Sequence, residues 1–132
     1  MKIEFFQECM APKTTAQQKG RRTYNPMKVR NAKITWRAIA RRHKPAKPLA
    51  GPLRCELAVT WPWTAAQEKQ GLKSPALKQT KPDTDNIEKA LWDACEDEGY
   101  FTVGDQQIAD KRVTKWHGPI PGVAVMIEEM EP

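Results

Sequence analysis

The sequence is poor in features that would stabilise a small chain covalently or anchor it in a membrane. Its 132 residues include only three cysteines, Cys9, Cys55 and Cys95. Their odd number and the lack of C-x-x-C spacing predict neither a disulfide framework nor a zinc knuckle. No apolar run approaches the roughly 20 residues needed to span a bilayer, and the first residues lack the apolar core of a signal peptide. We therefore expect a cytoplasmic protein with no membrane association, a single core and buried cysteines.

Acidic residues are scarce in the first part of the chain. The net charge is +6. Residues 1–54 contain fourteen Lys or Arg and two acids, whereas residues 55–132 contain eight and fourteen, giving +12 and −6. An ordinary solvated surface and a polyanionic partner such as nucleic acid both account for this segregation.

Apolar spacing predicts an α/β (α+β) fold, with a small mixed sheet and two main helices in a single domain. Strands are expected at residues 2–9, 53–61, 107–115 and 123–127, and helices at residues 26–44 and 85–98. Residues 11–25 and 62–80 show no apolar periodicity. Both are expected to be loops, and 62–80 is expected to be a mobile arm that contacts substrate, in which Trp63 could stack on an unpaired base.

The first expected helix is amphipathic. Ala32, Trp36 and Ile39 recur on one side of it. The opposite sector collects five basic residues, which are Arg30, Lys33, Arg37, Arg41 and Lys44. This basic stripe is compatible with a solvated face and with contacts to phosphate.

Two aspartates stand at the start of the second expected helix. Pro82 disfavours helical geometry at Lys81, so the chain should be extended there, with Asp83 and Asp85 pointing the same way. Two carboxylates that converge at a helix N-terminus can hold a hard divalent cation. The alternative is that Asp85 or Asn86 caps the helix and that Asp83 is a solvated turn residue.

Further charged residues extend this pattern. Lys89 follows Asp85 by four residues and Asp93 follows Lys89 by four, so all three should share the polar face of the helix. As simple i,i+4 pairs they stabilise a helix by only a few tenths of a kcal/mol. Alternatively, they place a cation beside a metal site, where it would offset charge on a phosphoryl group. A third acid, Asp105, follows Gly104 near the start of the next strand.

The combined pattern resembles a known family. Its positions are Lys81, Pro82, Asp83, Thr84, Asp85, Asn86, Ile87, Lys89, Ala90, Asp93, Gly104, Asp105, Gln106, Gln107 and Asp110. It is similar to the RusA family of Holliday junction resolvases, most strongly over residues 81–115. The resemblance implies that Asp83, Asp85 and Asp105 are catalytic acids that bind Mg²⁺, with Mn²⁺ as an alternative ion. It also implies that Lys89 is the catalytic lysine.

The resemblance further implies a homodimer, encoded by a bacterium, phage or prophage, that nicks two strands of a four-way DNA junction symmetrically without a small-molecule cofactor. Asn86 and Asp93 match supporting positions of the motif. The candidate DNA contacts are Lys19, Arg21, Arg22 and the basic stripe. One departure is Gly104, since family members often carry an acid there. Two alternatives remain: a non-catalytic basic DNA-binding module, and a flap or single-strand nuclease with the same acidic site.

Overall fold

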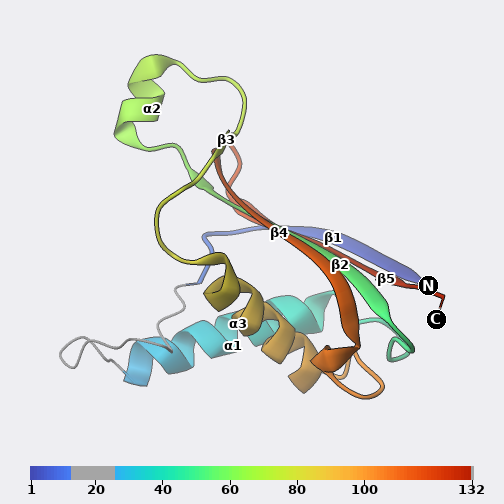
Figure 1. Ribbon diagram of the computed structural model, residues 1–132. Helices are drawn as coiled ribbons and strands as arrows, with labels where there is room; N and C mark the ends of the chain where they lie inside the picture. The colour runs from blue at the N-terminus through green and yellow to red at the C-terminus, as the bar shows by residue number, and fades with distance from the viewer. Residues whose placement is uncertain (13–25, 132) are drawn as a thin grey trace.

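The computed structural model describes residues 1–12 and 26–131, in which two long helices cover one face of a five-stranded sheet (Figure 1). The strands are β1 (Lys2–Glu8), β2 (Leu53–Pro62), β3 (Ala76–Leu77), β4 (Ile108–Gly118) and β5 (Gly122–Glu129). The helices are α1 (Pro26–Arg42), α2 (Ala65–Gln70) and α3 (Thr84–Asp97), and a 3₁₀ turn, η1 (Asp105–Gln107), precedes β4.

The sheet is mixed, as the sequence predicts. Its strand order is β1-β5-β2-β4-β3. Strand β2 runs parallel to β4 and antiparallel to β5, and the two outer strands, β1 and β3, are antiparallel to their neighbours. The α+β prediction is confirmed. Within the described ranges, no helix has the length and apolarity that crossing a membrane would require.

The core lies between the sheet and the two long helices. The expected apolar side of α1 is buried at Ala32, Trp36 and Ile39, and every second residue of β2 from Leu53 to Val59 is buried as well. Helix α3 contributes Ile87, Leu91, Trp92, Ala94 and Cys95. Burial of a large apolar side chain stabilises the fold by about 1.5–3 kcal/mol. This shared core fixes α3, which carries most of the candidate site, against β2 and α1.

The cysteines behave largely as expected. Cys55 and Cys95 are buried and Cys9 is partly buried, and all three are free thiols. Burial raises the pKa of Cys55 to about 12, and burial also raises the pKa of Cys95. Both buried thiols are therefore neutral and unreactive at neutral pH.

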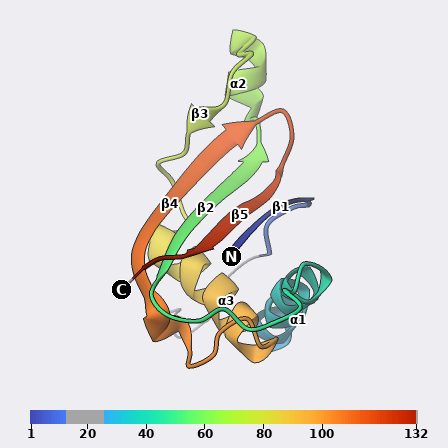
Figure 2. The ribbon, with the colours of Figure 1, turned by 90° about the vertical axis from the view of Figure 1, so that its right-hand side faces the viewer.

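The segment 62–80 was predicted to be a loop, and this prediction is wrong in part. It forms α2, which projects beyond the sheet, and β3, a two-residue edge strand paired with β4 (Figure 2). Thr64 and Gln67 make a capping box at the start of α2, and Gly71 ends the helix with a left-handed φ of 67°. Helix α2 buries no residue. Local capping, rather than apolar periodicity, therefore forms this helix.

The end of α1 differs from the prediction, and some of the predicted DNA contacts lie outside the described residues. Helix α1 ends at Arg42, so Lys44 lies just beyond it rather than within its last turn. Pro45, one residue further on, cannot continue a helix. The candidate DNA contacts Lys19, Arg21 and Arg22 lie outside the described residues, as does most of the loop expected at 11–25.

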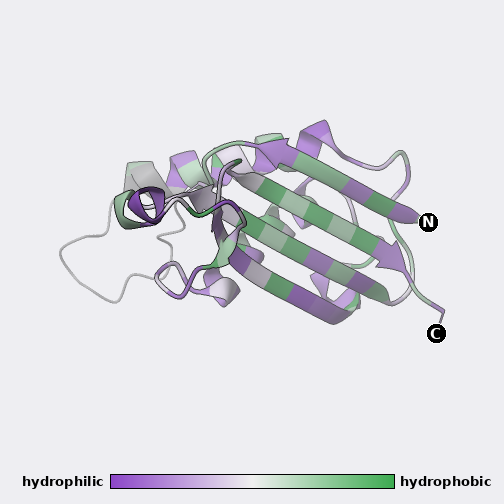
Figure 3. Ribbon diagram, turned by 90° about the horizontal axis from the view of Figure 1, so that it is seen from above, coloured by the Kyte–Doolittle hydropathy of each residue, from purple (hydrophilic) through white to green (hydrophobic). Residues whose placement is uncertain are grey.

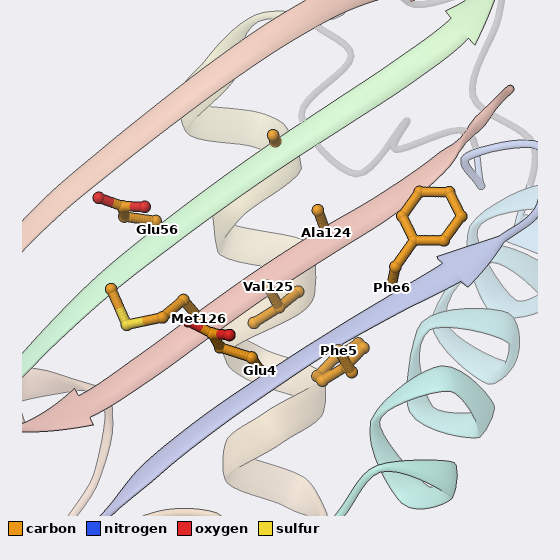
Figure 4. A pocket seen from close by; sticks show the side chains of 8 residues that line it. Glu4, Phe5, Phe6, Glu56, Ala124, Val125 and Met126 are labelled. Atoms are coloured by element: carbon orange, nitrogen blue, oxygen red, sulfur yellow. The ribbon is translucent and has the colours of Figure 1, made fainter. Parts of the chain in front are cut away.

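The second face of the sheet is not covered by any helix of the described ranges. Figure 3 shows polar and apolar residues alternating along its strands. A shallow groove of about 430 Å³ lies on this face, where Met126 of β5 stands between Glu4 of β1 and Glu56 of β2 (Figure 4). Phe6 and Ala124 line the same groove. The motif acids do not line this groove, so the candidate active site lies elsewhere, along α3.

Candidate active site

The N-terminal end of α3 carries the first two acids of the motif. Asp83 is the N-cap residue, with extended φ and ψ of −72° and 150°, and its side chain makes no capping hydrogen bond. The expectation that Asp85 or Asn86 caps the helix is therefore wrong, because the backbone already turns helical at Thr84. Asp83 and Asp85 are both exposed, so two carboxylates at this end remain accessible to a ligand.

Two lysines pair with aspartates at the start and in the middle of α3. Lys81 Nζ lies 3.7 Å from Asp83 Oδ2, and both side chains are largely exposed. Lys89 Nζ lies 3.6 Å from Asp93 Oδ2 in the expected i,i+4 pair. Because residues four apart are neighbours on a helix surface, Lys89 also lies one turn from Asp85. The polar face of α3 therefore presents Asp85 and, one turn later, an ammonium group, and Asp83 precedes both as the N-cap.

Asp105 lies near the opposite end of the same helix. Its backbone amide donates to Glu96 Oε1 at 2.9 Å, in the last turn of α3. Asp85 and Glu96 are eleven residues apart, or about 16 Å along a helix axis. Figure 1 shows α3 running from the connector that follows β3 towards the loop that leads into β4. Among the described residues, no three His, Cys, Asp or Glu side chains come close enough to hold one ion.

Glu96 occupies space beside Gly104, where family members often carry an acid. A Cβ atom at Gly104 would lie 2.5 Å from Glu96 Oε1 and 2.3 Å from Gln106 Oε1. The Glu96 carboxylate thus supplies a negative charge next to Asp105 from the helix instead of from residue 104. The sequence motif does not include Glu96. Its spacing could have identified it, since eleven residues are close to three full turns and place Glu96 on the same face as Asp85.

The loop around Asp105 is held by the side chain of Gln107. Gln107 Oε1 accepts from the amides of Val103 at 2.7 Å and Gly104 at 3.1 Å. Gln107 Nε2 donates to the carbonyls of Leu49 at 3.1 Å and Gly51 at 3.0 Å. This glutamine belongs to the sequence motif, and its contacts explain why the turn before β4 is well defined.

The basic stripe on α1 divides into two groups. Arg37 Nη2 and Arg41 Nε form ion pairs with Glu98, at 3.1 Å and 2.9 Å, and the Glu98 side chain is only 7% exposed. The hydrogen bond from Arg41 is the main cause that lowers the pKa of Glu98. Arg30 and Lys33 are exposed, and no acid in the described part of the chain pairs with either. Of the four stripe residues within α1, two therefore join α1 to α3, and two remain available to an anionic ligand.

Comparison with known proteins places this arrangement in a family. A family model described as "Endodeoxyribonuclease RusA" matches residues 10–128. "Uncharacterized protein YqaN" of Bacillus subtilis (strain 168) is 31% identical over 98 residues, which cover 70% of this chain and 68% of that protein. The name of that relative states no activity, so the family match carries the assignment. This chain belongs to the RusA family of endodeoxyribonucleases, which are hydrolases that resolve Holliday junctions.

Proposed function

We propose that this protein resolves four-way DNA junctions by two symmetric, divalent-metal-dependent phosphodiester cuts made by a homodimer in the cytoplasm. The observation that carries the proposal is the start of α3. There the carboxylates of Asp83 and Asp85 are exposed, Asp85 stands one helical turn before Lys89, and the side chain of Asp83, the N-cap residue, makes no capping hydrogen bond. Membership of the family supports the substrate class.

The acid pair suits a hard divalent cation. Carboxylate oxygens are the ligands that Mg²⁺ prefers, and Mn²⁺ accepts the same ligands. When bound, such an ion activates water and stabilises the leaving oxygen of an in-line displacement. Asp83 and Asp85 would hold the ion, and Asp105 would complete its ligand set. Asn86, which is half-buried beside Asp85, would support the acid pair.

Lys89 supplies positive charge where the scissile phosphate approaches. Its ammonium would offset the charge that grows on the phosphoryl oxygens in the transition state. Asp93, 3.6 Å from Lys89, would keep that ammonium directed along the polar face of α3. The free amides at the start of the helix also favour a phosphate there.

Asp105 would reach the ion from a second copy of the chain. Within one chain Asp105 lies beside Glu96, near the far end of α3 from the acid pair. If two copies placed the polar faces of their α3 helices antiparallel, Asp105 of each would lie towards Asp83 and Asp85 of the other. Two such sites would also be related by a two-fold axis, which suits paired cuts in a symmetric junction.

The proposal predicts that Asp85→Asn lowers Mg²⁺-dependent nicking of a synthetic four-way junction by at least about a hundredfold, the scale expected for removal of one preorganised charge. Asp97→Asn, which changes an exposed acid at the other end of α3, is the matched control and should retain activity. Labelled junction, flap, duplex and single-stranded DNA are tested in parallel. Full nicking by Asp85→Asn would refute the assignment. Cleavage of no substrate would favour the binding module, and preference for flaps or single strands would favour the other nuclease.

Mixing variants tests the shared site separately. Asp85→Asn and Asp105→Asn should each be inactive. In a mixed dimer, one site would combine the intact acid pair of one copy with the intact Asp105 of the other, so mixing should restore single nicks in the junction. If all three acids act within one chain, every site in the mixture is damaged and no activity returns.

A further inference from the structure

The backbone just before Asp83 is held on strand β4 by one lysine. Lys115 Nζ donates to the carbonyl of Thr80 at 2.6 Å and to the carbonyl of Pro82 at 2.7 Å. The carbonyl of Lys115 also accepts from the amide of Lys78 at 2.9 Å. These three hydrogen bonds connect one residue of β4 to both ends of the short connector between β3 and α3.

The side chain of Lys115 has different partners from that of Lys111, another lysine on the same strand. Lys111 Nζ forms an ion pair with Glu88, a side chain of α3. Lys115 is half-buried, and its ammonium bonds to backbone carbonyls. Hydrogen bonds from an ammonium are stronger than those between neutral groups, so this contact restrains the main chain itself. Lys111 tethers the helix, whereas Lys115 tethers the connector that leads into it.

We propose that Lys115 is a positioning residue for the metal-binding carboxylate of Asp83, an inference that rests on the proposed function. The carbonyl of Pro82 and the amide of Asp83 belong to the same rigid peptide plane. Fixing that carbonyl therefore limits the positions that Asp83 can take relative to Asp85. Residues that orient metal ligands in this way act through the ligand, and their loss weakens metal binding about 10–100-fold.

The test compares Lys115→Met with the matched control Lys111→Met. Binding of Mn²⁺ to the DNA-free protein, followed by electron paramagnetic resonance, should weaken about tenfold or more in Lys115→Met. It should change little in Lys111→Met. In junction nicking, the Mg²⁺ concentration for half-maximal rate should rise by a similar factor, while the rate at saturating Mg²⁺ changes much less. Lys115→Arg keeps the charge and the donors and should recover most of the affinity.

Two further measurements keep the outcomes distinct. Hydrogen exchange at residues 79–84 of the metal-free protein should accelerate in Lys115→Met and not in Lys111→Met. Unchanged exchange, unchanged Mn²⁺ affinity in a folded Lys115→Met protein, or an equal loss in Lys111→Met would each overturn the positioning role. If Lys115→Met does not fold, Lys115→Gln, which keeps two N–H donors and loses the charge, is expected to show an intermediate loss of Mn²⁺ affinity. Full nicking by Asp85→Asn would instead refute the metal site, whatever the exchange shows.

Discussion

Glu98, just beyond the C-terminal end of α3, and the acid pair at its N-terminal end lie in opposite environments. At the C-terminal end, Glu98 is buried and accepts hydrogen bonds from Arg37 and Arg41 on another helix. At the N-terminal end, Asp83 and Asp85 are exposed, and Asp83 makes no capping hydrogen bond although it occupies the capping position. The Glu98 carboxylate joins two helices, whereas the carboxylates of Asp83 and Asp85 stay accessible.

Along α3, the buried acid contributes to the stability of the fold, and the exposed acids are accessible to a ligand. A buried carboxylate must be paired, because an uncompensated buried charge is strongly destabilising. Asp83 and Asp85 are accessible and repel each other, and an exposed ion pair such as that of Asp83 with Lys81 adds little to stability. Local arrangements of this kind, which stability alone does not favour, are expected at functional sites. The comparison therefore predicts that substitutions at the two ends have separable effects.

The largest effect should come from Lys89→Met at the N-terminal end. We expect nicking of a four-way junction at saturating Mg²⁺ to fall about 10²–10³-fold, because a charge aimed at the transition state is lost. The melting temperature should hardly change, since an exposed i,i+4 pair contributes at most about 0.5 kcal/mol. Lys47→Met, which changes an exposed lysine beyond α1, is the control. Normal nicking by Lys89→Met would reduce Lys89 to an ordinary surface pair.

The reverse pattern is expected for Glu98→Gln at the C-terminal end. Losing the ion pairs to Arg37 and Arg41 should lower the melting temperature, while the folded variant still nicks junctions. Hydrogen bonding to Arg41 lowers the pKa of Glu98 from its ordinary value of 4.5, so its contribution to stability is present above pH 4.5. That contribution is lost as the pH falls through the lower, folded-state pKa.

Urea unfolding at several pH values tests this linkage. The stability difference between the parent protein and Glu98→Gln should be constant near neutral pH and should shrink as the pH falls below 4.5. Asp97→Asn, one residue away but exposed, should show no comparable difference. A gap that stays constant into the acid range would contradict the assignment of Glu98 as the ionised partner of the two arginines.

The sequence predicted those parts of the fold that depend on regular apolar spacing. Alternation identified β2, and the buried sides of α1 and α3 followed helical periodicity. Helix α2 was missed because it buries no residue and depends on the Thr64 and Gln67 capping box. Strand β3 was missed because two residues carry no periodicity. Local capping forms α2, whereas pairing with β4 forms β3.

The motif predicts the residues of the candidate site but not their arrangement. It names Asp83, Asp85, Lys89 and Asp105, yet spacing along the chain could not show that Asp105 lies beside Glu96. The pairing of Arg41 with Glu98 spans 57 positions, so it depends on how α1 packs against α3. Tertiary contacts of this kind decide which basic residues of α1 remain available to an anionic ligand.

The smallest predicted effect concerns that division of the basic stripe. Replacing both Arg30 and Lys33 with Gln should weaken junction binding a few-fold at low salt. If each contacts one phosphate, the negative slope of log K against log salt should become shallower by about 0.9 for each residue replaced. Arg37→Gln should instead lower the melting temperature, with a smaller change in slope, because its guanidinium pairs with Glu98. Fluorescence anisotropy of a labelled junction over a salt series measures the slopes. Equal slopes for the parent protein, the double variant and Arg37→Gln would mean that this part of α1 does not contact the DNA backbone. The cationic surface that binds the junction would then lie elsewhere.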